Sequence, residues 1–408
     1  MITQRFESGL TVIARHVPNR VVTLDAWVNA GSANEDDELN GVSHFLEHML
    51  FKGTAKYGVG ELDKAVTGVG GVWNAGTSKD YTHYYVTVAA PFVDTALDAI
   101  SDMLQNPLID SGEFDSEKRV ILEEYRLKQD NPWGALFDEL YEASFVRGPY
   151  RRSVIGTFES VSGLTRGAMV DYFERYYAPA NMTFIVVGDI EPELAVAKTR
   201  AAFQGFNRPH RPLAARNDTA EYASGVARVI PRDVQETYAA IAFPAPAIRE
   251  FDDMLALDVA ATILGEGRSS RLYRALKEDM RLVNLVAAGF PTHRQESIFY
   301  VGMTLERGKL DAARTETLRL VRNMAGNAPP TEAELAKAKR IIRNSYCFAT
   351  ETNTGQSGVL GYYQTLMGSA DFVDKYLQSL DAVTRDNTMA VVRRYLSREP
   401  NMVVVEPK

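Results

Sequence analysis

The chain contains a single cysteine, Cys347, and only six histidines in 408 residues. One thiol excludes an intramolecular disulfide, and it also excludes a zinc site built on several thiolates. We expect Cys347 to serve only as a small buried hydrophobic residue. Any metal centre in this chain must therefore be built from a few imidazoles together with carboxylates.

Long apolar runs and clusters of basic residues are also missing. No apolar run reaches the roughly 18 residues needed to cross a bilayer, and the first residues lack the basic-then-apolar pattern of a secretory signal. Lys and Arg are dispersed, and the formal net charge is -8. This charge argues against nucleic acid or an anionic membrane as a partner. We expect a cytoplasmic protein without membrane insertion, with the periplasm as the alternative.

The sequence repeats itself. Residues 164–187 recur as residues 383–405, an offset of about 220 residues, in a helix-then-strand order. The stretch Lys118-Arg119-Val120-Ile121 likewise recurs as Lys339-Arg340-Ile341-Ile342. A chain of this length is expected to hold two or three domains. We therefore interpret it as a duplicated domain.

The boundary between the two copies is expected in a polar, proline-bearing segment without periodicity. We predict an N-terminal domain over residues 1–207, a linker over 208–220 and a C-terminal domain over 221–408. Strands and helices come in blocks and do not alternate regularly, which favours the α+β class. Each domain should be a mainly antiparallel sheet with helices packed on it, and the two domains should enclose a chamber.

The most informative motif is His44-Phe45-Leu46-Glu47-His48. On a helix, residues four apart share one face, so His44 and His48 can supply two imidazole ligands to one zinc ion. A plain buried helix, with both imidazoles bonded to polar neighbours, is the competing interpretation. Burying two His and a carboxylate without a partner is costly, and a metal ion is the simplest such partner.

A third ligand must come from another part of the chain. Glu117 and Glu124 are seven residues apart on a predicted helix over 112–130, so they share a face with Ile121. We choose Glu124 as the third zinc ligand and Glu117 as the acid that orients a ligand His. From spacing alone, Glu123 is a rival ligand, and a solvated charged helix face fits equally well. The motif does not recur after residue 48, so one Zn²⁺ per chain is expected.

This set of residues predicts metal-assisted hydrolysis. Zinc lowers the pKa of bound water to about 7, and a nearby carboxylate can accept the proton of that water. Glu47 is not needed as a ligand and is placed for this role. We expect the substrate bond to be an amide, and cleavage of small esters alone would instead indicate a different metallohydrolase.

The motif, followed about 76 residues later by the last Glu of Glu-Lys-Arg-Val-Ile-Leu-Glu-Glu, resembles the inverted-motif zinc peptidases. This family includes pitrilysin, insulin-degrading enzyme and mitochondrial processing peptidase. The resemblance covers the whole chain, including the duplication and Gly31-Ser32-Ala33-Asn34-Glu35. It implies a zinc-dependent endopeptidase acting on unfolded or extended peptides. The roles it implies are ligands for His44, His48 and Glu124, general base for Glu47 and supporting acid for Glu117.

The resemblance also implies a binding site for the substrate backbone. The segment Asn74-Ala75-Gly76-Thr77-Ser78 resembles the family's edge strand, to which an extended peptide adds as a further strand. The residues that we assign to peptide binding are Asn74, Ala75, Gly76 and Thr77. Without the resemblance, the same segment would be interpreted as a turn before a strand.

The C-terminal half departs from the family pattern. Active members carry an Arg and a Tyr, seven residues apart, that contact substrate, and the corresponding positions here are Lys277 and Asn284. Lys retains the charge but lacks the planar fork of Arg. We therefore predict a heterodimer in which a homologous subunit carries the Arg and Tyr, with a homodimer as the alternative. A non-catalytic structural or peptide-binding subunit is the competing function, although such chains usually lack part of the zinc set.

Overall fold

The computed structural model describes residues 1–209, 211 and 219–408, which form two compact units. The first unit comprises residues 1–126, 152–217 and 348–373, and the second comprises 127–151, 218–347 and 374–408. Each unit is thus assembled from three separate stretches of chain and differs from the continuous ranges 1–207 and 221–408. Most of the expected linker, residues 208–220, lies outside the described residues.

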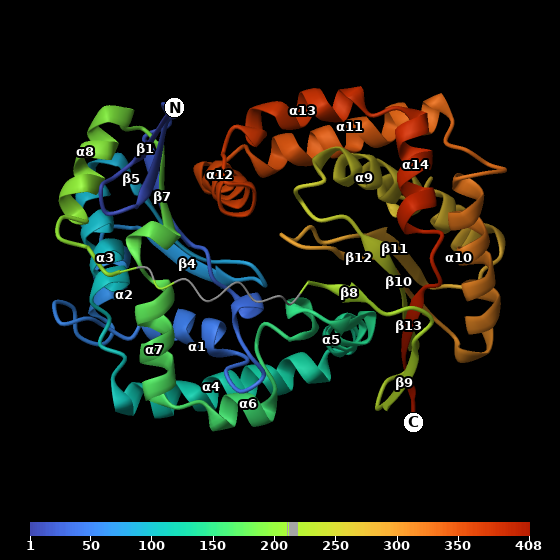
Figure 1. Cartoon of the computed structure of the whole chain (residues 1–408), viewed down its shortest axis with the longest axis horizontal. Helices are drawn as coiled ribbons and strands as arrows, with labels where there is room; N and C mark the ends of the chain where they lie inside the picture. Colours follow the sequence, from blue (N-terminus) through green and yellow to red (C-terminus); the bar gives the residue numbers. More distant parts are fainter. Residues whose placement is uncertain (210, 212–218) are drawn as a thin grey trace. The chain divides into compact units, whose positions relative to one another are not determined.

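The first unit is built on a six-stranded sheet with the strand order β1-β2-β7-β3-β5-β4 (Figure 1). Neighbouring strands are antiparallel except for the parallel pair β2 and β7. The expected α+β class with mainly antiparallel sheets is confirmed. The strands are β1 (Ile2–Arg5), β2 (Thr11–His16), β3 (Val21–Val28), β4 (Val72–Thr77), β5 (Thr82–Ala89) and β7 (Met182–Gly188).

Seven helices of the N-terminal half pack on one face of this sheet and bury a single large core. The division between the two units falls inside the long helix α4, after Arg126, and α4 contains the helix predicted over 112–130. These helices are α1 (Val42–Leu50), α2 (Glu61–Thr67), α3 (Val93–Gln105), α4 (Ser111–Asp130), α6 (Phe158–Gly163), α7 (Arg166–Tyr176) and α8 (Pro192–Ala202).

Strand β3 shows that this sheet is covered on both faces. Successive side chains of a strand point to opposite faces. Val22, Leu24 and Ala26 belong to the core beneath the helices of the N-terminal half. Asp25 and Trp27 point the other way and are buried as well. A second layer must therefore cover the face that carries Asp25 and Trp27.

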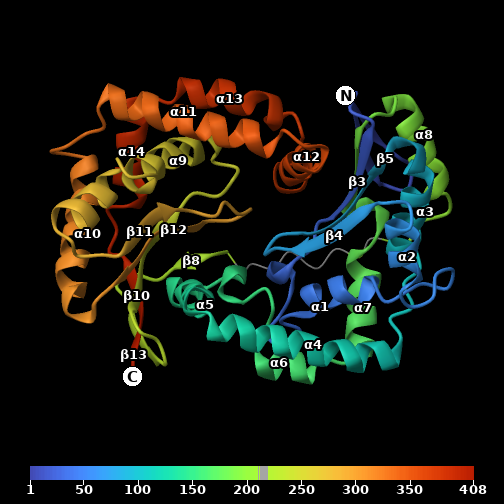
Figure 2. The same ribbon diagram turned by 180° about the vertical axis from the view of Figure 1, so that it is seen from behind.

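That second layer is helix α12 (Asn353–Met367), which comes from the C-terminal half of the chain and packs on β3 and β7 (Figures 1 and 2). The Ser357 hydroxyl donates a hydrogen bond to Asp25 at 3.0 Å. Gly361 lies directly against the ring of Trp27, where a β-carbon would stand 2.1 Å from Cε2. The close approach of α12 to β3 therefore depends on a residue without a side chain.

The second unit contains a five-stranded sheet with the order β11-β12-β10-β13-β9. This order equals that of β4-β5-β3-β7-β2 in the first sheet, and β13 and β9 are again the parallel pair. The matching topology agrees with the duplication inferred from the sequence. The strands are β9 (Ala227–Arg232), β10 (Thr237–Ala245), β11 (Leu285–Gly289), β12 (Ser297–Leu305) and β13 (Asn401–Pro407), and a separate pair joins β6 (Phe145–Arg147) to β8 (Glu221–Tyr222).

The helices of the second unit include one from the N-terminal half. Helix α5 (Pro132–Ser144) packs on β10 and β13, where the Trp133 ring meets Tyr238 edge-on with 5.5 Å between centroids. Helices α5 and α12 follow the long helices α4 and α11 respectively, so the two copies exchange equivalent helices. The other helices of this unit are α9 (Phe251–Gly265), a π-helix over Tyr273–Asp279, α10 (Leu310–Met324), α11 (Glu332–Ala349), α13 (Phe372–Ala382) and α14 (Arg385–Tyr395).

Two further features bear on the sequence-based expectations. Among the described residues, no helix combines the length and the apolar character needed to span a bilayer. Cys347 was expected to be buried, but it is exposed near the end of α11, because the apolar stripe of that helix lies on its other side. The chamber between the domains stays a prediction.

Candidate metal centre

Helix α1 carries the His-x-x-Glu-His motif, and its amphipathic pattern decides which side chains remain accessible. Phe45, Leu46 and the other apolar residues of α1 are fully buried under the sheet. His44, Glu47 and His48 lie on the opposite side of the helix and are only partly buried. The burial pattern therefore presents all three functional side chains of the motif together.

The first turn of α1 is fixed by a buried carboxylate. Glu35 is completely buried and accepts hydrogen bonds from the backbone amides of Gly41 and Ser43 at 2.8 Å and from the Asn40 side chain at 2.9 Å. Burial raises the pKa of Glu35, and these hydrogen bonds partly offset that effect. A carboxylate at this end also complements the positive end of the helix dipole. Sequence reasoning quoted Glu35 within a family segment but did not assign it this role.

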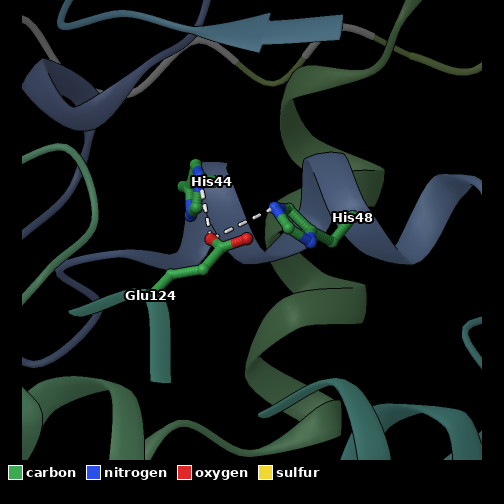
Figure 3. A group of neighbouring side chains, drawn as sticks. All are labelled: His44, His48 and Glu124. Atoms are coloured by element: carbon green, nitrogen blue, oxygen red, sulfur yellow. Dashed lines mark ion pairs between the residues drawn. The ribbon is translucent and has the colours of Figure 1, made fainter. Parts of the chain in front are cut away.

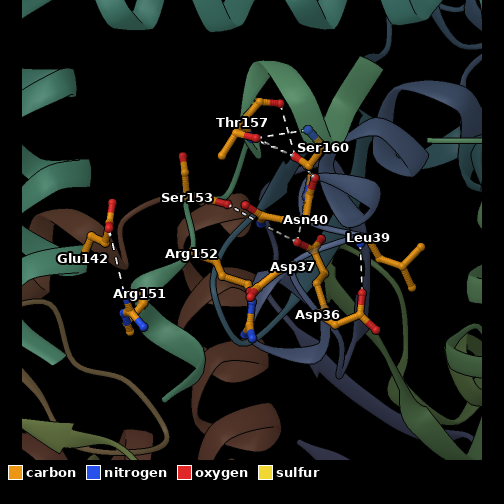
Figure 4. A network of polar contacts seen from close by, with 12 residues as sticks. Asp36, Asp37, Leu39, Asn40, Glu142, Arg151, Arg152, Ser153, Thr157 and Ser160 are labelled. Atoms are coloured by element: carbon orange, nitrogen blue, oxygen red, sulfur yellow. Dashed lines mark hydrogen bonds and ion pairs between the residues drawn. The ribbon is translucent and has the colours of Figure 1, made fainter. Parts of the chain in front are cut away.

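The loop before α1 is also tied to residues 152–160 (Figure 4). The Asn40 side chain donates to the Ser153 carbonyl at 2.9 Å, and Ser160 donates to the Asn40 carbonyl at 2.8 Å. Arg152 pairs with Asp37 at 2.8 Å. These contacts hold the entry to the motif helix against a segment more than 110 residues further along the chain.

His44, His48 and Glu124 form a group whose ligand atoms all lie within 4.8 Å of one another. Oε2 of Glu124 is 3.9 Å from His44 Nε2 and 3.7 Å from His48 Nε2 (Figure 3). Ligand atoms around a tetrahedral zinc ion are separated by roughly 3.4 Å. The donor set of two imidazoles and one carboxylate, at these separations, therefore fits one zinc ion with a position left for water.

The structure also shows how the two adjacent acids of α4 differ. Glu124 reaches toward the imidazoles of α1, whereas Glu123 is exposed and pairs with Arg126 on its own helix. Successive residues on a helix point about 100° apart. Packing of the buried face of α4, which includes Ile121, directs Glu124 and not Glu123 toward the motif.

Glu117 and Lys52 form a second layer behind His48. Nδ1 of His48 is 2.9 Å from Oε1 of Glu117, so Nε2 is the nitrogen that faces Glu124. Lys52 contacts the other oxygen of Glu117 at 2.5 Å. The hydrogen bond with His48, aided by Lys52, lowers the pKa of Glu117 despite its burial. Burial lowers the pKa of His48, but the bond with Glu117 and the charge of Glu124 outweigh burial and raise it overall.

Sequence reasoning did not identify Lys52 as a partner of Glu117. The signal was present, because Lys52 follows His48 by four residues and therefore lies one helical turn further along. Helix α1 ends at Leu50, so helical spacing alone does not place Lys52. The structure shows that the Lys52 side chain reaches Glu117. Lys52 adds to the effect of His48 in lowering the pKa of Glu117, whose carboxylate orients the His48 ring.

Glu47 lies beside the edge strand β4. The Thr77 hydroxyl at the end of β4 donates a hydrogen bond to Oε2 of Glu47. Burial raises the pKa of Glu47, and the bond from Thr77 and the charge of His48 partly oppose that rise. A carboxylate with a raised pKa accepts and releases a proton nearer neutral pH, as a general base must.

The segment Asn74-Ala75-Gly76-Thr77 forms most of strand β4, so the interpretation as a plain turn is wrong. Strand β4 pairs with β5 on one side and is an edge of the first sheet within the described residues. Asn74 is exposed, and its side-chain oxygen accepts a hydrogen bond from the Ala75 amide at 2.9 Å. An exposed edge of this kind can pair with an extended peptide.

Lys277 and Asn284 belong to the second unit. Lys277 lies in the π-helix, and its ammonium group is 5.1 Å from the centroid of the Tyr273 ring. Asn284 precedes β11 and donates a hydrogen bond to Glu236 at 2.6 Å. π-helical segments are rare and often accompany functional sites. Contact of Lys277 and Asn284 with substrate stays a prediction.

Comparison with known families agrees with this site. A model described as insulinase, peptidase family M16, matches residues 10–158, which contain the motif and all three candidate ligands. A model described as the peptidase M16 inactive domain matches residues 163–342. The chain belongs to peptidase family M16. The first model lies within the first copy of the duplicated domain, and the second extends from the end of that copy into the second.

Curated relatives within M16 span almost the whole chain. An uncharacterized zinc protease of Mycobacterium leprae is 30% identical over 98% of this chain and 90% of its own length. The zinc protease PqqE of Helicobacter pylori is 26% identical over 98% of this chain and 91% of its own length. The names of these M16 relatives agree with the donor set of His44, His48 and Glu124, which fits zinc.

Solved structures show that the M16 architecture is shared. A protease from Helicobacter pylori superposes with a TM-score of 0.93 at 25% identity, covering 100% of this chain and 99% of the other. A structure described as a peptidase M16 inactive domain from Pseudomonas fluorescens gives a TM-score of 0.91 at 19% identity, covering 100% and 98%. The second match concerns the fold alone.

Proposed function

We propose that this M16 chain is a zinc-dependent endopeptidase that hydrolyses unfolded or extended peptides as the zinc-bearing subunit of a heterodimer. The observation that carries the proposal is the convergence of His44, His48 and Glu124 beside the partly buried carboxylate of Glu47. The group combines a complete zinc donor set with a separate base. A subunit that had lost catalysis would not need both.

Zinc, when bound by His44, His48 and Glu124, supplies a Lewis acid that acidifies water and polarises a carbonyl group. Glu47 accepts the proton of the attacking water and then delivers it to the nitrogen of the leaving amine. Thr77 holds the Glu47 carboxylate in place through its hydroxyl hydrogen bond. Glu117 accepts a hydrogen bond from Nδ1 of His48. This bond fixes the orientation of the ring, so that Nε2 faces the metal position.

The edge strand β4 supports an extended peptide as the substrate. A peptide can add to β4 only if its own N–H and C=O groups are not already paired in a folded structure. Thr77 joins this strand to the base Glu47, so a peptide bound along β4 is aligned with the proton acceptor. A substrate must therefore first offer an extended, unpaired backbone, and only then can its side chains affect binding.

The second unit supports the need for a partner. Lys277 offers one charge without the bidentate geometry of Arg, and Asn284 offers an amide where a Tyr hydroxyl is expected. We propose that a homologous subunit supplies the Arg and Tyr. The competing proposal, a non-catalytic peptide-binding subunit, draws on the same two positions and on the name of the family model that matches residues 163–342.

Metal analysis and peptidase assays test this proposal. The purified chain should bind one zinc ion, Glu124→Gln should lose it, and the matched control Glu123→Gln should retain it. Cleavage of an unfolded fluorogenic peptide by the chain alone should be weak. The double substitution Lys277→Arg with Asn284→Tyr should raise kcat/KM, because it restores the expected pair within one chain.

Two results would contradict different parts of the proposal. A zinc-loaded double variant that cleaves no peptide would favour the non-catalytic subunit. Strong cleavage by the unmodified chain, with a monomer mass measured by light scattering, would retain the endopeptidase but remove the heterodimer.

A further inference from the structure

A histidine and a buried aspartate form a pair on the face of the first sheet opposite the motif helix. Asp25 on β3 has 1% of its side chain exposed, and one of its oxygens lies 3.2 Å from Nδ1 of His83 on β5. The other oxygen accepts the hydrogen bond from Ser357 of α12. A buried carboxylate needs hydrogen-bond donors or a cation. Asp25 therefore binds the Nδ1 side of His83 and fixes the orientation of its ring.

The fixed ring directs Nε2 of His83 toward the edge strand. Trp27, His83 and Gly76 are directly opposite one another on β3, β5 and β4. The His83 ring lies against Trp27 with 4.5 Å between centroids. A β-carbon on Gly76 would stand 3.3 Å from Nε2 and 3.5 Å from Cδ2 of His83.

The space above Gly76 is bounded by this ring. Apart from Gly76 and its two chain neighbours, no other described atom lies within 4 Å of the position that a β-carbon of Gly76 would take. Helix α12 covers Trp27 on β3, yet His83 keeps 22% of its side chain exposed. Tyr81, just before β5, and Tyr85 on β5 flank the ring, at 6.0 and 5.8 Å between centroids. Nε2 of His83 is therefore the atom nearest to the open position of the missing Gly76 side chain.

We propose that His83 selects an acidic side chain in the peptide bound along β4. This inference rests on the proposed function, because it needs a peptide that extends the first sheet. Strands in a sheet lie about 4.8 Å apart, and side chains on one face of neighbouring strands are in contact. The peptide residue opposite Gly76 meets no side chain on β4, so an Asp or Glu at that position reaches across to Nε2 of His83.

The charges around His83 favour a carboxylate over other groups. With both ring nitrogens protonated, the imidazole donates from Nδ1 to Asp25 and from Nε2 to the carboxylate of the peptide. The ring then lies between two anions, and hydrogen bonds between ionised partners are stronger than neutral ones. A Lys in the peptide would face the same cation and be repelled. The site therefore distinguishes Glu from both Gln and Lys.

Peptide binding to the zinc-loaded Glu47→Gln protein tests the proposal without turnover. A series of fluorescein-labelled peptides carries one Glu, or the matched Gln, at each successive position. Kd is measured by fluorescence anisotropy in the same buffer for every peptide. At one position the Glu peptide should bind about tenfold more tightly than its Gln counterpart.

Substitutions then locate the origin of the preference. His83→Gln should bring the two peptides to equal affinity, whereas His83→Lys retains a cation and should keep the preference for Glu. His16→Gln is the matched control, since His16 also pairs with an aspartate, Asp189, at 3.4 Å on the same sheet. This control should leave the ratio of the two affinities unchanged.

The possible results distinguish the proposed role of His83 in peptide specificity from the proposed peptidase activity. A series with no preferred position, or a preference that survives His83→Gln, overturns the role of His83. If the protein binds the Glu peptide selectively but cleaves nothing, even as the Lys277→Arg, Asn284→Tyr variant with Glu47 intact, the endopeptidase proposal fails and the role of His83 stands. Cleavage without any preference for Glu removes the role of His83 alone.

Discussion

The two units share five strands in the same order, yet among the described residues only the first unit carries a candidate metal-binding group on the helix between β3 and the edge strand. Helix α1 follows β3 and leads to the edge strand β4, and helix α9 follows β10 and leads to the edge strand β11. Helix α1 leaves His44, Glu47 and His48 partly accessible. Helix α9 contains no histidine, and most of its residues are buried. The scaffold therefore folds with or without the metal residues, which serve function and not stability.

One polar residue interrupts the apolar helix α9. Asp258 lines a cavity of about 400 Å³ together with Glu266, Gly289 and Tyr300. Desolvation raises the pKa of Asp258 to about 7, and no hydrogen bond from a neighbouring donor counteracts the rise. In the first unit, by contrast, the carboxylates near the motif have hydrogen-bond donors. Carboxylates near the motif of the first unit are thus stabilised by hydrogen bonds. Asp258 of the second unit lacks this stabilisation, so its carboxyl group is costly to ionise.

The exchanged helices show what the two copies still share. Helix α12 places Gly361 against Trp27 in the first unit, and helix α5 places Trp133 against Gly302 in the second. In both units a tryptophan fits where a glycine leaves room. Both copies have thus retained an exchanged helix that lies close to the sheet. Among the described residues, the candidate metal site occurs in only one copy.

The largest expected effect comes from removing the base that only the first unit has. Glu47→Gln should lower kcat by a factor on the order of 100 to 10,000, because the water then lacks its proton acceptor. Peptide hydrolysis and zinc content are measured on the same preparation. Zinc content should not change, since Glu47 is not among the candidate ligands. Full activity in this variant would assign the base to another residue.

Next in size is the acid behind the ligand. Glu117→Gln should weaken zinc affinity by roughly 10 to 100-fold, because His48 loses the carboxylate that orients its ring. Competition with a chelator of known affinity measures the change. Lys52→Met should weaken zinc binding less, and the exposed Glu123→Gln should leave it unchanged. Equal effects of Glu117→Gln and Glu123→Gln would contradict the arrangement around His48.

The helix exchange can be tested with two glycines on one helix. Gly361→Ala should lower the free energy of unfolding by about 3 kcal/mol, because the new methyl group collides with the buried ring of Trp27. Gly358→Ala meets nothing within 4 Å and should be neutral or raise stability by less than about 1 kcal/mol. Urea unfolding followed by fluorescence measures both. Similar values for the two variants would show that α12 does not pack on β3 in solution.

The smallest effect concerns the interrupted helix of the second unit. Folded Asp258 holds its proton up to about pH 7, whereas the ordinary value is 3.8. Protonation therefore stabilises the fold below about pH 4, and this contribution is lost as the pH rises toward 7. The full pKa shift corresponds to about 4 kcal/mol, but Asp258 is only partly buried and lines a cavity, so solvent screens its charge. Asp258→Asn should therefore exceed the unmodified chain in stability by about 1 to 2 kcal/mol at pH 8 and by little at pH 4. Asp252→Asn, near the exposed start of α9, is the control, and a pH-independent gain would contradict the explanation.

Parts of the site could be predicted from sequence because they depend on local geometry. The helix repeat places His44, Glu47 and His48 together, and it separates Glu117 from Glu124 by two turns along one face. The choice between Glu123 and Glu124 was harder, because either residue could face the motif until the packing of α4 was known. Lys52 was missed because it lies beyond the end of α1, where helical spacing gives no direction.

Other features required the fold itself. The apolar patterns of α5 and α12 predict that each helix buries a face, but they do not identify the sheet that receives it. Nothing in the local sequence marks His83 as part of a pair, since Asp25 is 58 residues away. The pairing of β3 with β5 brings these two residues together, and the pairing of β5 with β4 brings the ring to Gly76.

The sequence by itself determined the duplication, the α+β class and the chemistry of the motif, because helical spacing and residue type act over a few neighbouring residues. Tertiary structure decided which helix covers which sheet, which acids support the ligands and which residues line the edge strand. Those outcomes depend on contacts between segments far apart in the chain. Such contacts are selected by the fit of whole surfaces, which no local pattern specifies.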